Sequence, residues 1–79
     1  MDMSKLVVGV QAAVDVINRH MVTDIKMDRF ENDRNLIDLT ITITCMDFGR
    51  GEYQKTVFVN DLTKKAAKTL ESFVNYYMI

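Results

Sequence analysis

The stretch of sequence that decides the fold is LIDLTITITCMDF, at residues 36–48. Apolar and polar residues alternate through it almost without interruption. The apolar set is Ile37, Leu39, Ile41, Ile43 and Cys45, and the polar set is Asp38, Thr40, Thr42 and Thr44. Successive side chains of a β-strand point to opposite faces of the sheet. The alternation therefore predicts a strand with one buried, apolar face and one face rich in threonine.

Two further strands are predicted on either side of this stretch. Residues 23–31 place Ile25 and Met27 on an inward face and Asp24, Lys26 and Asp28 on an outward face. Residues 52–59 place Tyr53, Val57 and Val59 on one side and Gln54, Thr56 and Phe58 on the other. The turn-forming residues 32–35 and 49–51 separate the three runs. Short turns of this kind predict an antiparallel meander with residues 36–48 in the centre.

A helix is predicted before the strands and another after them. The first runs over residues 4–20 with Ser4 as its N-cap, although five valines in this segment leave a strand over residues 5–10 as an alternative. Its predicted core stripe is Leu6, Val7, Val10, Ala13, Val14, Ile17 and Met21. The second helix begins near residues 60–63, and its predicted core stripe is Ala66, Leu70, Phe73, Val74 and Tyr77. The expected fold is α+β, in the order α-β-β-β-α, with both helices packed on one face of the sheet.

Length and composition predict one domain over residues 1–79. A hydrophobic content of 48% argues against disorder, and a net charge of −1 lacks the basic excess of a typical nucleic-acid-binding protein. No apolar run approaches the ~20 residues that cross a bilayer, and the N-terminus does not resemble an export signal. Cys45 is the single cysteine, so no internal disulfide is possible. We therefore expect a cytoplasmic protein that does not bind membranes.

Residues that could carry catalysis are few. His20 and Cys45, the single residues of their types, lie in different predicted elements, whereas a Cys–His nucleophile pair needs both in one cleft. The acids Asp24, Asp28 and Asp38 alternate with Lys and Thr, which is typical of a solvated sheet face rather than a metal site. No glycine-rich loop precedes a helix. We expect no enzyme activity, no cofactor, no metal and no small-molecule substrate.

A lysine cluster opens the second predicted helix, in the run KKAAK at residues 64–68. Lysines at a helix N-terminus are mildly unfavourable, and such positions can mark an anion site. The run resembles the KKxAK that opens the last helix of double-stranded RNA-binding domains, which share the α-β-β-β-α order. The resemblance implies that Lys64, Lys65 and Lys68 contact phosphates. Glu71, Ser72 and the loop at residues 32–35, which lies in an acidic region, depart from the family's pattern. Lysines on the solvent-facing side of a surface helix are the simpler interpretation.

Surplus apolar residues indicate a protein interface. Val8, Ala12 and Val16 form a second stripe on the first helix, opposite the predicted core stripe and next to Gly9. The apolar C-terminal segment adds Tyr76, and together these five residues are the predicted interface. The leading hypothesis is a small non-enzymatic protein-binding module that forms a homo-oligomer, such as a homodimer, and docks on a partner protein. Its size and style are similar to accessory and inhibitory proteins of phages and mobile elements. Nucleic-acid binding through the lysine cluster is the alternative, and a structural subunit of a larger assembly is third.

Overall fold

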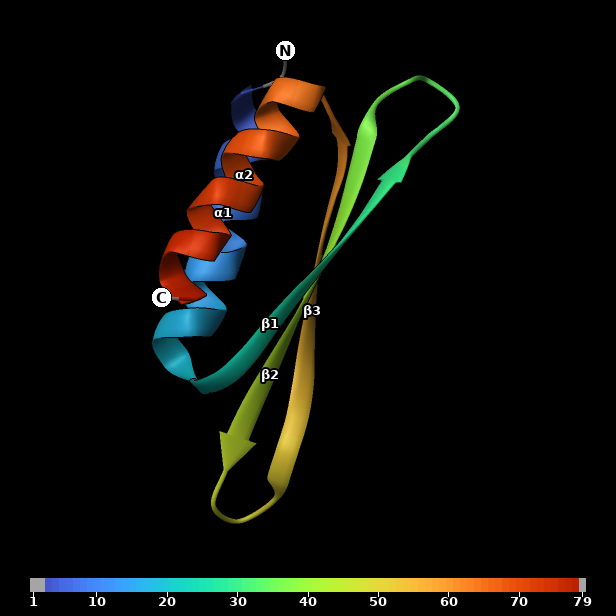
Figure 1. The fold of residues 1–79 in the computed structure, drawn as a ribbon. Helices are drawn as coiled ribbons and strands as arrows, with labels where there is room; N and C mark the ends of the chain where they lie inside the picture. The colour runs from blue at the N-terminus through green and yellow to red at the C-terminus, as the bar shows by residue number, and fades with distance from the viewer. Residues whose placement is uncertain (1–2, 79) are drawn as a thin grey trace.

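The computed structural model describes the backbone of residues 3–78 and the side chains of residues 7–76. The elements follow the order α1 (Met3–Arg19), β1 (Met21–Glu31), β2 (Ile37–Asp47), β3 (Gly51–Leu62) and α2 (Lys64–Met78). The three strands form one antiparallel sheet in the order β1-β2-β3, and both helices lie on the same side of it (Figure 1). The predicted α+β fold, with its α-β-β-β-α order and central strand, is confirmed.

The alternating pattern of β2 places its side chains as predicted. Its odd-numbered residues point toward the helices and are almost fully buried: Ile37, Leu39, Ile41, Ile43 and Cys45. On the opposite face Thr40 and Thr42 are half-buried, while Thr44 is buried, so this face is less open than the pattern predicts. Burial of this apolar row between the sheet and the helices is the main source of the fold's stability.

The third strand is longer than predicted, because it continues past residue 59 to Leu62. The register with β2 shifts between Ile37 and Leu39, so that Leu39 lies opposite Val59 while Ile37 lies opposite Leu62. Asp61 takes up the shift with a positive φ of 58°, a conformation that Asp adopts more readily than most residues. The bulge returns Leu62 to the buried face, where it completes the core.

Helix α2 begins immediately after its cap. The hydroxyl of Thr63 accepts a hydrogen bond from the backbone N–H of Ala66 at 3.1 Å, which is the usual role of an N-cap threonine. The predicted core stripe is confirmed for Ala66, Leu70 and Val74, which are buried, and Phe73 packs against them in part. Tyr77 lies outside the described side chains. Ala67 joins the buried stripe.

Helix α1 is present as predicted over residues 5–10, which excludes the alternative strand. Its predicted core stripe is confirmed at Ala13, which is fully buried, and at Val10, which packs against the core, but it is wrong elsewhere. Val7 belongs to the predicted core stripe, yet it is 60% exposed. Gly9, predicted to lie outside the core stripe, is buried, and Val16 packs against the core. Met21 is exposed and begins β1, and the side chain of Leu6 lies outside the described residues. The buried side of α1 is therefore shifted from the predicted stripe toward Gly9 and Val16, because the missing side chain of Gly9 allows the helix to approach β3 closely.

Candidate protein-binding groove

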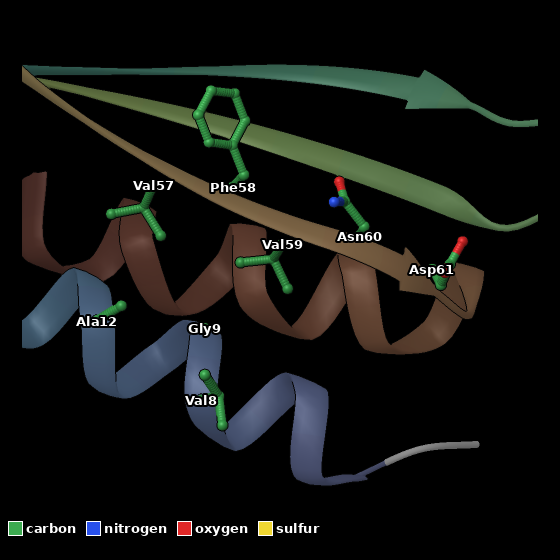
Figure 2. Close-up of a pocket in the computed structure, with 8 residues that line it drawn as sticks. All are labelled: Val8, Gly9, Ala12, Val57, Phe58, Val59, Asn60 and Asp61. Carbon is green, nitrogen blue, oxygen red and sulfur yellow. The ribbon is translucent and has the colours of Figure 1, made fainter.

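A groove runs between helix α1 and the outer edge of strand β3 (Figure 2). It has a volume of about 450 Å³. The helix contributes Val8, Gly9 and Ala12, and the strand contributes Val57, Phe58, Val59, Asn60 and Asp61. In Figure 2, β3 lies at the near edge of the sheet with β2 and β1 behind it, and α1 runs below it. We call this feature the β3 groove.

The close approach of α1 to β3 is set by Gly9. A methyl group added at Gly9 would lie 2.6 Å from Cγ2 of Val59 and 3.0 Å from its Cγ1, well inside van der Waals contact. Val59 is 5% exposed and β-branched, so it has little freedom to move away. Glycine at this position therefore has a packing role inside the molecule. It also brings the helix close enough to β3 to form one wall of the groove.

Over residues 56–60, the strand edge that borders the groove carries no charge and is not paired with another strand. Strand β3 pairs with β2 alone within the part of the chain that the structure describes, so residues 56–60 present backbone N–H and C=O groups at its other edge. Residues 56–60 of this strand, Thr-Val-Phe-Val-Asn, contain no charge and no proline. Phe58 is 68% exposed, and Val8 on the facing helix is 67% exposed. The groove thus combines backbone hydrogen-bonding groups with exposed apolar side chains.

A polar network fixes the end of the groove at Asp61. The side-chain amide of Asn32 donates to Oδ1 of Asp61 at 2.8 Å and to Oδ1 of Asp38 at 3.1 Å. The guanidinium of Arg34 contacts both carboxylate oxygens of Asp61, at 2.6 and 2.7 Å. The backbone N–H of Asp61 donates to Oδ1 of Asp38 at 2.9 Å. The loop between β1 and β2 is thereby tied to the bulge in β3, so the edge beside the groove is held in place.

The predicted interface residues separate into two groups. Val8 and Ala12 line the β3 groove, where they are available to a ligand. Gly9 lines it too but is buried against Val59, and Val16 packs against the core, so placing these two outside the core was wrong. Tyr76 is 77% exposed on α2 and does not line the groove. The structure does not unite the five residues in one surface.

The predicted phosphate-binding lysines are exposed on the first turns of α2. The first turns of α2, which carry these lysines, lie at the same end of the molecule as the loop between β1 and β2 (Figure 1). That loop region carries the exposed acids Glu31 and Asp33. The backbone N–H of Ala66, which would face an anion at the helix N-terminus, is already bonded to Thr63. The lysine cluster is therefore a local patch of positive charge at an end of the molecule that also carries acidic side chains.

A second concave region lies where the end of α1 meets the hairpin between β2 and β3. Arg19, His20, Arg50, Tyr53 and Lys55 line it together with Asp47 and apolar residues. Nδ1 of His20 lies 2.7 Å from the hydroxyl of Tyr53, and either can donate, depending on the histidine tautomer. Desolvation of the half-buried ring raises the pKa of Tyr53, as do Cys45 and Asp47, whereas Arg50 lowers it. The phenol therefore stays protonated at neutral pH.

The geometry around Cys45 does not resemble a nucleophile site. Its thiol is buried, and its Sγ lies 3.8 Å from the backbone oxygen of Ile43. Among the described residues, no three or more His, Cys, Asp or Glu side chains are grouped to hold a metal ion. In the same part of the chain, neither helix combines the length and the apolar character that a bilayer crossing requires.

Sequence reasoning missed the strand side of the groove. The signal is present, since residues 56–60 form an uncharged run in an edge strand, but alternation alone does not distinguish this run from that of any half-buried strand. Comparisons with protein-family models, with curated proteins and with solved structures gave no match. The candidate site therefore rests on the residues and geometry described above.

Proposed function

We propose that this protein is a protein-binding module that captures an extended segment of another polypeptide at the β3 groove. The observation that carries the proposal is the uncharged run at residues 56–60 on the outer edge of β3, beside a helix that presents Val8 and Ala12. A strand edge of this kind is a template for strand addition, in which a peptide continues the sheet by main-chain hydrogen bonds. Side chains that flank the edge then select among peptides.

The groove specifies the chemistry of the segment that it accepts. Main-chain pairing along residues 56–60 requires an extended segment of about five residues without proline, since proline lacks the N–H that the ladder uses. Alternate side chains of that segment would point to the helix side, beside Val8 and Ala12, or to the open side, beside Phe58. A charge in the middle of the segment would be desolvated without a partner. The favoured occupant is therefore uncharged and partly apolar at its centre.

Peptide selection followed by amide mapping tests this proposal. The full chain is used to select binders from a library of linear random peptides, and each selected peptide is titrated into labelled protein by NMR. We expect shifts at the backbone amides of residues 56–60 and of residues 8–12. The matched variants Phe58→Lys and Phe30→Lys place the same charge on opposite sheet edges, and only Phe58→Lys is expected to weaken binding. Shifts confined to other surfaces, or equal loss in both variants, would contradict the proposal.

Nucleic-acid binding is the second candidate, favoured by the exposed lysine cluster on α2. If Lys64, Lys65 and Lys68 bind phosphates, affinity for duplex RNA should fall steeply with salt concentration and collapse in the triple alanine variant. We expect affinity no tighter than the micromolar range, because Glu31 at the end of β1 and Asp33 in the following loop add negative charge at the end of the molecule where α2 begins (Figure 1). A tight, salt-sensitive complex measured by fluorescence anisotropy would place this function first.

A further inference from the structure

We propose that the strand which adds to β3 is β3 of a second copy of this chain, so that two sheets join across a two-fold axis into one of six strands. This inference rests on the proposed function, because it names the occupant of the same groove. The segment that the groove requires is extended, uncharged at its centre and partly apolar. Residues 56–60 of the chain itself meet that description.

The register of the pairing follows from side-chain chemistry. In an antiparallel two-fold pair the two strands run past each other, and residues on the same face lie opposite one another. Centring the pair on Phe58 places Phe58 opposite Phe58 of the second copy and Val57 opposite Val59 of the second copy. Thr56 then lies opposite Asn60 of the second copy. Every pair in the centre is uncharged, and aromatic and β-branched pairs are favourable across strands.

Charge at the two ends of the run supports a second copy as the occupant. Lys55 precedes the uncharged run and Asp61 follows it. Antiparallel pairing centred on Phe58 sets Lys55 of each copy opposite Asp61 of the other copy, whose carboxylate also binds Arg34, so neither charge lies opposite an apolar residue of the run. Centring on Val57 would set Lys55 opposite Val59 of the second copy. Centring on Val59 would set Asp61 opposite Val57 of the second copy. The Phe58 register alone avoids both mismatches.

The same pairing accounts for the exposed side of α1. Helix α1 lies mainly along β3 on the helix-bearing face of the sheet. Joining two β3 edges therefore sets two α1 helices next to each other on that face. Val8, which is 67% exposed, and Ala12 both line the groove at the β3 edge and would lie near the two-fold axis. An apolar helix side and an apolar strand edge would then be covered by one contact.

The mass of the full chain in solution is the first test. Sedimentation or light scattering across a concentration series should show a species of twice the 9.1 kDa of one chain. Phe58→Lys sets two like charges opposite each other and should raise the dissociation constant at least about tenfold. Phe30→Lys is the matched control, because Phe30 is equally exposed at the β1 edge and its replacement should leave the dimer unchanged. Circular dichroism confirms that both variants fold.

A cross-linking experiment tests the register independently of affinity. Directly opposed residues of an antiparallel pair have Cβ atoms about 4.5–5.5 Å apart, close to the span of a disulfide. Phe58→Cys should therefore form a covalent dimer under mild oxidation, while Phe30→Cys stays monomeric over the same time. Cys45 is buried and does not interfere. Cross-linking at equal rates in the two variants would overturn the proposed pairing.

The outcomes separate this inference from the proposed function. A chain that stays monomeric at every concentration, while selected peptides still map to residues 56–60, overturns the second copy and leaves strand addition intact. A dimer that Phe58→Lys does not weaken overturns the β3 contact. If no selected peptide maps to the groove and the chain stays monomeric, both proposals fall. A dimer lost in Phe58→Lys and cross-linked through Phe58→Cys supports the second copy.

Discussion

The two edge strands of the sheet, β1 and β3, manage their exposed edges in different ways. Strand β1 places charged residues on its outward face at Asp24, Lys26 and Asp28. On its other face Arg29 forms an ion pair with Glu71 of α2, with a nitrogen-to-oxygen distance of 3.6 Å. The register of β1 also shifts between Val22 and Asp24. Charges and a bulge are the usual means by which an edge strand is protected from pairing with another chain.

Strand β3 lacks this protection over residues 56–60. No charge falls in that run, and the neighbouring helix α1 leaves a groove beside it instead of an ion pair. Its bulge lies beyond the run, at Asp61, where Asn32 and Arg34 hold it. Both edges belong to one sheet in one small domain, so general demands of folding do not explain the difference. The comparison supports the proposal that β3 accepts an added strand, since the charges and the bulge that oppose pairing at β1 are absent from residues 56–60.

The largest expected effect on stability concerns β2, the central strand, which pairs with both edge strands. Ile41 is fully buried in β2, between Met27 of β1 and Val57 of β3. Ile41→Ala removes a buried side chain and leaves a cavity, so it should lower the free energy of unfolding by about 2–5 kcal/mol in urea denaturation. Thr42→Ala, on the opposite face, should cost less than about 1.5 kcal/mol. A larger loss from Thr42→Ala would invert the assignment of the two faces.

A charge at Val16 or at Val8 tests which side of α1 is buried and which side faces the groove. Val16 packs against the core, so Val16→Glu would desolvate a carboxylate and should lower the free energy of unfolding by about 2 kcal/mol or more. Val8→Glu is the matched control. Since Val8 is exposed beside the groove, its replacement should change stability by less than about 0.5 kcal/mol. Equal losses in thermal or urea denaturation would mean that α1 packs in a different rotation.

Gly9 tests how α1 is fixed to β3. Gly9→Val would drive a branched side chain into Val59, and overpacking of this kind typically costs about 1–3 kcal/mol. The double variant Gly9→Val with Val59→Ala supplies the missing space. The double variant should therefore lose less free energy of unfolding than the two single variants lose in sum. A double-mutant cycle measures this coupling. Additive losses would show that the two residues do not share a contact.

The smallest expected effect on stability comes from giving β1 the character of β3. Lys26→Thr with Asp28→Thr removes two outward charges of opposite sign and should change the free energy of unfolding by less than about 0.5 kcal/mol. The unprotected β1 edge should then pair as well, producing species larger than those of the unaltered chain in sedimentation. Lys64→Thr with Asp33→Thr removes the same charges away from both edges. If this control associates equally, edge charge does not govern pairing.

Much of the fold was contained in local sequence patterns. The alternation at residues 36–48 determined which face of β2 is buried, because a strand's side-chain period is two and leaves no other choice. The turn residues at 32–35 and 49–51 determined the meander. The stripe at Ala66, Leu70 and Val74 determined the buried side of α2, where a single apolar face was available. Each of these features depends on residues close together in the chain.

Tertiary structure alone decided the rotation of α1 and the existence of the groove. Helix α1 carries apolar residues on both sides, so periodicity could not choose between them. The choice follows from Gly9, whose missing side chain allows the helix backbone to approach Val59 of a strand fifty residues away in sequence. The bulge at Asp61 likewise depends on Asn32, Arg34 and Asp38. Sequence alone determines local periodicity, whereas contacts between distant segments are decided by which surfaces can come closest when packed.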